Sequence, residues 1–175
     1  MTLYTVVDSP LGELLLVGEE SPGTPGQAAL ASLSMPGQRG APRIEPGWQR
    51  APAAFGAAVH QLRAYFAGEL TTFQLEFAAR GSAFQQRVWQ ALDTIPYGRT
   101  TTYGALAERL GVEREEVRAV GAAIGANPLL LVRPCHRVIG ADGSMRGYAA
   151  GIARKEALLT HEGALQPQLE LDLGL

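Results

Sequence analysis

The stretch TTTYGALAERLGVEREEVRAVGAAIG, residues 100–125, predicts two short helices in succession. Threonines that can cap a helix precede the first of them, Tyr103–Leu110, and Gly111 is placed to end it. The second helix runs from about Glu113 to Gly125, so that only a short turn separates the two. Two helices joined by a tight, glycine-containing turn form a helix-turn-helix.

One face of the second helix is built from small residues. Val117, Val120 and Ile124 recur at helical spacing and predict its buried side. The other positions, apart from Arg118, hold short side chains or none: Ala119, Gly121, Ala122 and Ala123. This face is suited to close approach to another surface. That surface is either a neighbouring helix or a DNA groove, and only the groove would also accept an unpaired arginine.

The helical pattern extends on both sides of this motif. Upstream, Ser82 and Gln85 make a capping box for a further helix. Downstream, the pattern predicts a final helix over Ile152–His161. We therefore expect one mostly helical domain over residues 80–163, followed by a poorly ordered tail, residues 164–175.

The first 79 residues have a different pattern, in which strand and helix signals alternate. The predicted elements are strands at Leu3–Val7, Glu13–Val17, Ala28–Ser34 and Thr72–Phe77 and a helix over Pro52–Gly68. Most of residues 19–50, which are rich in Gly and Pro, are expected to form a surface loop. The chain is thus predicted to be α+β, with a small N-terminal α/β domain (1–79) that contains a short antiparallel sheet.

Cys135 is the only cysteine of the 175 residues, and it lies in the stretch Pro134-Cys135-His136-Arg137-Val138. A thiol beside an imidazole is the pairing that activates a cysteine nucleophile. The alternative is a small buried apolar residue, the usual role of an unpaired cysteine. One cysteine and three scattered histidines do not make a zinc cluster, so we expect no metal.

Composition narrows the function classes. An apolar content of 46% and a charged content of 18% are typical of a globular protein. Residues 80–160 carry eleven Arg and Lys against seven Asp and Glu, whereas residues 1–79 carry four Arg against seven acids, so the basic middle is the part suited to a polyanion. There is no apolar run long enough to span a bilayer and no export signal, and with one cysteine the expected location is the cytoplasm.

Together these residues resemble the O6-alkylguanine-DNA alkyltransferase family. The resemblance is close from Phe84 to Gly163 and is limited to architecture before that. Its landmarks are Phe84 with Trp89, Pro96-Tyr97-Gly98, Tyr103, Arg118-Ala119-Val120-Gly121, Asn127-Pro128, the Cys135 pentapeptide, Gly147-Tyr148 and His161-Glu162-Gly163. It implies a ribonuclease H-like N-terminal domain and a winged helix-turn-helix-like DNA-binding domain. It also implies transfer of an alkyl group from guanine O6, and possibly thymine O4, in DNA to Cys135, with no cofactor.

The resemblance also implies catalytic roles for five residues. Cys135 attacks the alkyl carbon, His136 takes the thiol proton through a water molecule, and Glu162 orients the imidazole, as in a catalytic triad. Tyr103 gives a proton to the departing guanine. Asn127 ties the helix-turn-helix to the cysteine segment. Because the resulting thioether has no hydrolytic route back, each protein molecule acts once.

A base inside a duplex cannot be reached by a side chain, so the nucleotide must be rotated out at a cost of a few kcal/mol. By resemblance, Arg118 enters the stack from the minor groove and replaces the base, while Tyr103 crowds the rotated phosphate. The other implied positions are DNA contacts at Gln85, Gly104, Ala119 and Arg137, and a substrate pocket at Val138, Tyr148 and Ala149. We expect a monomer whose partner is double-stranded DNA containing alkylated guanine.

Two other functions stay open from the residues alone. One is a non-catalytic reader of alkylated DNA, although relatives of that type lack the cysteine; the other is a cysteine hydrolase that uses Cys135, His136 and Glu162. Arg137 has an alternative role in a structural salt bridge. Arg133 stands where the family usually has an aliphatic residue, and it would lower the thiol pKa, contact a phosphate or face solvent.

Overall fold

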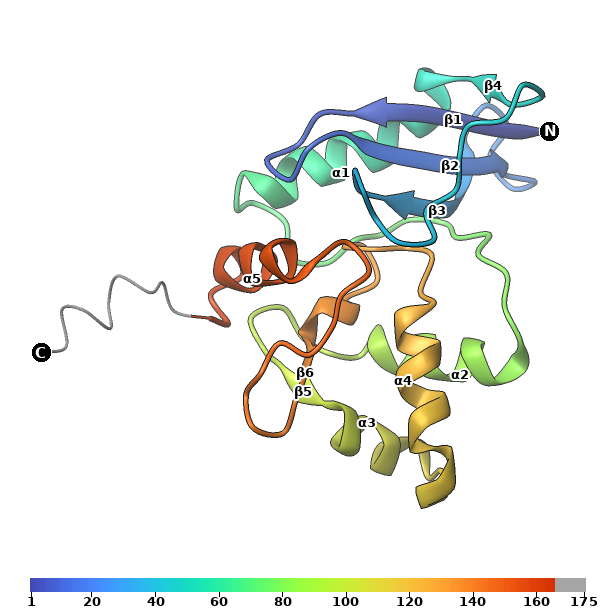
Figure 1. The fold of residues 1–175 in the computed structure, drawn as a ribbon. Helices are drawn as coiled ribbons and strands as arrows, with labels where there is room; N and C mark the ends of the chain where they lie inside the picture. The colour runs from blue at the N-terminus through green and yellow to red at the C-terminus, as the bar shows by residue number, and fades with distance from the viewer. Residues whose placement is uncertain (166–175) are drawn as a thin grey trace, which may run out of the picture.

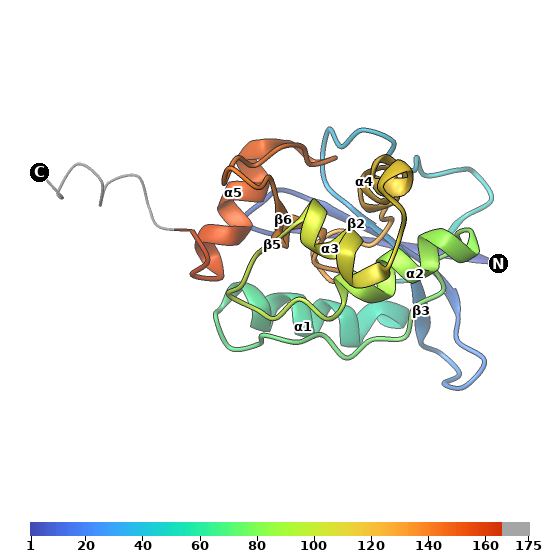
Figure 2. The ribbon, with the colours of Figure 1, turned by 90° about the horizontal axis from the view of Figure 1, so that it is seen from below.

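The N-terminal half is a four-stranded sheet with one long helix across one face (Figures 1 and 2). The computed structural model describes residues 1–165. In strand order β3-β2-β1-β4, β1 pairs antiparallel with β2, β2 pairs antiparallel with β3, and β4 pairs parallel with β1. The elements are β1 (Thr2–Val7), β2 (Leu14–Glu20), β3 (Ala28–Ser34), β4 (Gln49–Arg50), a 3-10 turn (Pro52–Phe55) and α1 (Gly56–Phe66).

The predicted hairpin, third strand and helix of this half are confirmed, but the strand predicted at Thr72–Phe77 is wrong. Only Phe77 makes a bridge, to Leu30 of β3. The backbone of Gln74 is instead bonded on both sides by the side chain of Gln61, at 2.8 and 3.0 Å. A side chain that satisfies the backbone in this way competes with strand pairing.

The C-terminal half is helical, as predicted, around a minimal two-stranded sheet. Its elements are α2 (Ala83–Leu92), β5 (Thr101–Thr102), α3 (Tyr103–Leu110), a 3-10 turn (Arg114–Glu116), α4 (Val117–Gly125), a 3-10 turn (Cys135–Arg137), β6 (Val138–Ile139) and α5 (Ile152–His161). Ser82 and Gln85 form the predicted capping box, and Gly111 ends α3 with a φ of 69°. The α-helical part of the second helix begins at Val117 rather than Glu113, because residues 114–116 form the tighter turn.

The two halves are held together by backbone pairing as well as by a common core. Leu33 of β3 donates to Pro128 O (2.9 Å) and accepts from Leu130 N (3.3 Å), so the sheet edge extends into the segment that leads to Cys135. The buried apolar cluster runs without a break from Leu14 through Trp89 to Leu158. The segment that carries Cys135 is therefore supported from both halves.

α3 and α4 lie on the side of the molecule that is turned away from the sheet (Figures 1 and 2). None of the helices within residues 1–165 has the length and apolar character needed to cross a membrane. From residue 166 onward, the tail expected to be poorly ordered lies outside the described part of the chain.

Candidate active site

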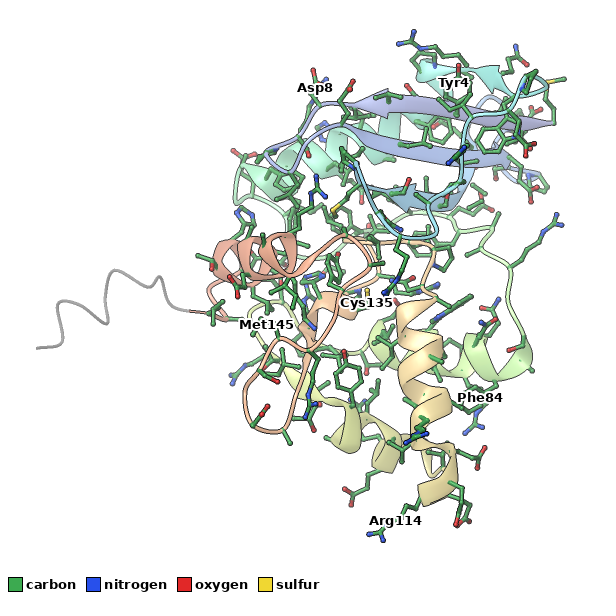
Figure 3. All side chains as sticks on the ribbon, viewed as in Figure 1. Tyr4, Asp8, Phe84, Arg114, Cys135 and Met145 are labelled. Carbon is green, nitrogen blue, oxygen red and sulfur yellow. The ribbon has the colours of Figure 1, made fainter. Side chains whose placement is uncertain are left out.

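Cys135 lies near the middle of the molecule, where the helical half meets the sheet half (Figure 3). The side chain of Asn127 organises the segment that carries it. Its Nδ2 donates to the carbonyls of Leu129 (3.3 Å) and Arg133 (3.1 Å), and its Oδ1 accepts from Leu129 N (3.0 Å). The amide thus joins the end of α4 to the cysteine turn.

A cavity of about 160 Å³ opens onto Cys135. Its lining comes from four separate parts of the chain: Arg39, Tyr103, Gly121, Ile124, Gly125, Leu130, Cys135, Gly147, Tyr148 and Ala149. The structure therefore brings Tyr103, Tyr148 and Ala149 together with Cys135 around one cavity. The hydroxyl of Tyr148 is buried and has no hydrogen-bond partner within residues 1–165, so the pocket contains an unsatisfied polar group.

Arg39 was not found by sequence reasoning. It belongs to the loop after β3, and its backbone N donates to Ala149 O (3.0 Å), which fixes the N-terminal half against the pocket wall. No local pattern around residue 39 indicates this contact, because it depends on how the two halves pack.

The thiol is protonated at neutral pH in this environment. Burial raises the pKa of Cys135, and a hydrogen bond involving Asn127 together with the positive charge of Lys155 only partly opposes the rise. A buried neutral thiol is a poor nucleophile. Any reaction at this sulfur therefore needs a nearby base to accept its proton.

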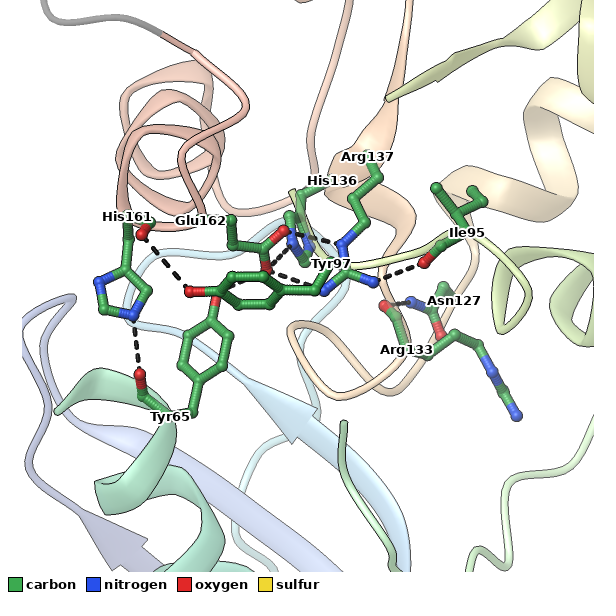
Figure 4. A network of polar contacts seen from close by, with 9 residues as sticks. All are labelled: Tyr65, Ile95, Tyr97, Asn127, Arg133, His136, Arg137, His161 and Glu162. Atoms are coloured by element: carbon green, nitrogen blue, oxygen red, sulfur yellow. Dashed lines mark hydrogen bonds and ion pairs between the residues drawn. The ribbon is translucent and has the colours of Figure 1, made fainter. Parts of the chain in front are cut away.

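The ring of His136 is held by Glu162, which fixes its tautomer (Figure 4). Its Nε2 lies 2.9 Å from Glu162 Oε2, and both side chains are fully buried. Burial by itself would raise the pKa of Glu162, but hydrogen bonds from His136 and Arg137 outweigh that effect and lower it to about 2. An ionised carboxylate only accepts hydrogen bonds, so Nε2 must carry the proton.

The second ring nitrogen of His136 is consequently the basic one. Nδ1 is buried without a hydrogen-bond partner in the part of the chain that the structure describes. Burial lowers the pKa of His136 despite the opposing effect of Glu162, so the ring is neutral at pH 7. His136 follows Cys135 directly in the chain, but its free Nδ1 makes no hydrogen bond to the thiol within residues 1–165, so a proton passing between them would need a bridging water molecule.

The small-residue face of α4 is divided between packing and exposure. Ala123 is buried, and its carbonyl accepts from Trp89 Nε1 of α2 (2.8 Å). Arg118, Ala119 and Ala122 are exposed. Helix packing therefore explains one side of the helix, while an arginine among alanines remains available to an outside surface.

Two family models match the chain. The ribonuclease-like domain of 6-O-methylguanine DNA methyltransferase matches residues 2–79, and its DNA binding domain matches residues 83–164. The chain belongs to the 6-O-methylguanine DNA methyltransferase family.

Similar members of the family cover nearly the whole chain. The methylated-DNA–protein-cysteine methyltransferase of Mycolicibacterium paratuberculosis is 49% identical over 95% of this chain and 96% of that protein. The protein of the same name from Methanosarcina acetivorans is 42% identical over 92% and 98%. The crystal structure of Mycobacterium tuberculosis OGT in complex with DNA has 47% identity and a TM-score of 0.81 and covers 99% of each chain.

One of the DNA contacts implied by the resemblance is buried instead, and two other implied positions need closer description. Arg137, expected at DNA, is buried and forms the structural salt bridge: Nε lies 2.7 Å from Glu162 Oε1, and NH1 donates to Ile95 O (2.6 Å). Val138 is fully buried and does not line the cavity, although its carbonyl could still face a base. The side-chain oxygen Oε1 of Gln85 accepts a hydrogen bond from Ser82 N, which leaves its amide nitrogen free to donate to a DNA phosphate.

The departure at Arg133 from the usual family pattern is also explained. Its side chain is buried beside the rings of Trp89 and Phe77, 5.3 and 5.6 Å from their centroids, and Nε lies 3.4 Å from Asp93 Oδ1. It neither faces solvent nor can reach a phosphate. Its charge makes a small contribution that lowers the Cys135 pKa.

Lys155 of α5 is a buried cation that the sequence did not single out. Its Nζ donates to the carbonyls of Val138 (2.7 Å), Met145 (2.6 Å) and Gly147 (3.1 Å). These bonds hold the pocket loop against the strand that follows the cysteine. Burial lowers the pKa of Lys155 to about 8, so it remains mostly charged at neutral pH.

Replacing Glu162 by glutamine should destabilise the fold by about 3 to 5 kcal/mol at pH 7, because it leaves Arg137 buried without its counter-ion. The pKa of Glu162 is lower in the folded state, so the carboxylate stabilises the fold above about pH 4.5 and loses this effect as pH falls toward 2. The difference in the free energy of unfolding between wild type and variant should therefore become smaller as the pH falls from about 4.5 toward 2. Urea unfolding at several pH values measures it.

The matched control is Glu19→Gln, which removes an exposed carboxylate 3.7 Å from Arg80. Exposed pairs contribute at most about 1 kcal/mol, so this change should leave stability nearly unaltered. Similar losses for the two variants would contradict the structural role assigned to the buried pair.

Proposed function

We propose that the protein repairs DNA by transferring a methyl or other alkyl group irreversibly from O6 of guanine to the sulfur of Cys135. O4-alkylthymine, which carries the same kind of alkylated oxygen, is a second substrate to test. The observation that carries the proposal is the cavity that ends at the only cysteine, beside a neutral histidine held by a buried carboxylate. The activity named for the relatives, and the DNA complex of M. tuberculosis OGT, support it.

The proposed step is a direct displacement. Sulfur is soft and polarisable, which suits attack on an alkyl carbon. The thiol proton passes to Nδ1 of His136 through a water molecule, a sulfur–carbon bond forms, and the carbon–oxygen bond breaks with its electron pair going to guanine. Guanine then takes a proton from Tyr103. His136 afterwards loses its proton and Tyr103 regains one from solvent, so the protein ends changed only at the sulfur.

Tyr103 is suited to donate that proton because it is protonated before the reaction. Burial raises its pKa, and it lies at the cavity with the thiol. The base within the cavity would be read by the carbonyls of Cys135 and Val138, the amide of Ala149 and the hydroxyl of Tyr148. The Val138 carbonyl already accepts from Lys155, so its second lone pair would serve the guanine.

Access to the cavity requires the nucleotide to leave the duplex. We propose that α4 enters the minor groove, which is only about 6 Å wide and suits the exposed alanines and Gly104 at the start of α3. Arg118 then occupies the space of the rotated base. A monomer suffices for this, since every proposed group comes from one chain.

One measurement distinguishes the proposal from its alternatives: incubation with DNA containing O6-methylguanine, followed by mass spectrometry of the intact protein. The expected result is a permanent gain of one methyl group per molecule. Tight binding without mass gain would indicate a non-catalytic reader. Turnover of an ester or peptide without mass gain would indicate a hydrolase.

His136 and Glu162 should act as one unit in this reaction. Because Glu162 works only through His136, removing both should cost little more than removing the worse one. Single-turnover rates of the two single variants and the double variant, measured where all are folded, test this. Losses that multiply would mean that the two side chains act independently.

The transfer rate should also fall as pH falls through the pKa of His136, because an imidazolium cannot accept the thiol proton. Burial lowers this pKa, so the acid limb should lie below the ordinary histidine value of 6.5. A rate that stays constant down to the lowest pH at which the protein remains folded would exclude His136 as the base.

We also propose a division of roles between the two halves of the chain and a cellular location. Residues 1–79 act as the supporting domain and residues 80–163 as the catalytic and DNA-binding domain. The protein works in the cytoplasm, which is supported by its need for a free thiol.

A further inference from the structure

The geometry points to Tyr65, in the N-terminal half, as a positioning residue that sets the basicity of His136 by donating a hydrogen bond to Glu162. The inference rests on the function proposed above and extends its site across the boundary between the halves. Tyr65 is in the last turn of α1 and is fully buried. Its hydroxyl lies 2.7 Å from Glu162 Oε2, a contact between residues 97 positions apart (Figure 4).

Tyr65 is held at both ends by consecutive residues of the other half. Glu162 accepts a hydrogen bond from the hydroxyl of Tyr65, and His161 Nε2 lies 2.7 Å from the backbone carbonyl oxygen of Tyr65. Aromatic rings pack around it, with centroids at 5.1 Å for Phe66, 5.5 Å for Phe73 and 6.1 Å for Tyr97. Such a ring cannot turn its hydroxyl away from the carboxylate without displacing its neighbours.

Tyr65 donates its hydrogen bond to Oε2 of Glu162, the same oxygen that orients His136. Glu162 Oε2 accepts from Tyr65 (2.7 Å), His136 (2.9 Å) and Arg137 NH2 (3.0 Å), whereas among residues 1–165 only Arg137 donates to Oε1. Burial raises the pKa of Tyr65, and the charge of Glu162 raises it further, so the phenol stays a donor throughout the working pH range.

A donor on this oxygen withdraws negative charge from the bond to His136. Removing it makes the carboxylate a stronger partner for an imidazolium, so the pKa of His136 rises. The other groups that face the pair are unchanged by this substitution: Arg137 next to His136, Tyr97 beside the carboxylate, and Lys155 from α5. Tyr65 thereby keeps His136 neutral and available as a base at lower pH.

The test is the pH dependence of single-turnover methyl transfer by Tyr65→Phe, in the full chain. The expected result is an acid limb displaced to higher pH by about half a unit or more, with a nearly unchanged rate above the limb. A purely structural role would lower the rate or the stability at all pH values and leave the limb in place.

The matched control is Tyr97→Phe, which removes a hydroxyl from the same aromatic cluster. Within residues 1–165 that hydroxyl donates to the backbone carbonyl of His161, at 3.5 Å, and makes no hydrogen bond to Glu162, so the limb should not move. If Tyr65→Phe does not fold, 3-fluorotyrosine at position 65 keeps the ring and makes the hydroxyl a stronger donor. The limb should then move to lower pH.

If the acid limb of the transfer rate lies at the same pH for wild type and for the position-65 variants, the inference is overturned and the proposed function is left intact. Equal displacement by Tyr97→Phe would also overturn it, because the effect would then belong to the cluster as a whole. A wild-type protein that gains no methyl group at any pH would instead overturn the proposed function.

Discussion

Cys135→Ser should take up no alkyl group from O6-methylguanine DNA, while its affinity for the same DNA stays close to that of wild type. The serine hydroxyl is a harder nucleophile and far less ionised than a thiol, and His136 cannot make up that difference. The substitution replaces one buried sulfur atom by oxygen, so the cavity and the exposed face of α4 should be left intact. The expected loss is complete on the timescale of the wild-type reaction.

The measurement is intact mass and peptide mapping after incubation with a labelled methyl group, with DNA affinity measured in parallel. Because the chain has no second cysteine, label on any other peptide could not be thiol transfer. Methyl uptake by the serine variant would rule out Cys135 as the acceptor. A large drop in DNA affinity would show that the variant is damaged rather than inactive.

Arg118→Ala should slow repair of duplex DNA strongly while barely changing the reaction with a free O6-alkylguanine base. Arg118 is exposed on α4 and is not among the residues that line the cavity, so we expect it to have no direct part in the chemistry. A free base has no stack to leave, so only the duplex carries the unstacking cost of a few kcal/mol that the arginine offsets. Each 1.4 kcal/mol not offset corresponds to about a tenfold loss of rate.

Two variants separate this role from a simple phosphate contact. Arg118→Lys should rescue only partly, because an ammonium cannot fill the gap as a planar guanidinium can. Arg114→Ala removes another exposed arginine, in the turn before α4, and should at most weaken DNA binding in a salt-dependent way. Equal losses on duplex and free base for Arg118→Ala would mean that the residue shapes the pocket.

Short-range signals in the sequence predicted most of the fold. The capping box at Ser82, the glycine that ends α3 and the apolar spacing of α4 are each complete within a few residues, so they could be read without a structure. The strand predicted at Thr72–Phe77 had the right alternation. It failed because the partner of its backbone, the side chain of Gln61, lies in another element.

The site residues also fall into those that short stretches of sequence indicate and those that depend on contacts between distant segments. Cys135 and His136 are adjacent, and family resemblance added Tyr103, Asn127 and Glu162. The contributions of Arg39, Tyr65 and Lys155 depend on contacts between segments far apart in the chain, and nothing in their local sequence marks them. Arg137 shows the reverse error, because a basic residue beside the nucleophile proved to be a buried counter-ion rather than a DNA contact.

The pairing of Leu33 with residues 128 and 130 has a consequence for how the chain responds to proteolysis. The free edge of β3 is covered in part by a segment of the other half, and the core is common to both, so the two halves share contacts that do not depend on an unbroken connection between α1 and α2. A protease that nicks this connection would leave two fragments that remain associated and elute as one particle. Expressed separately, each fragment would expose an unpaired strand edge and an open core, and would need the other to become soluble.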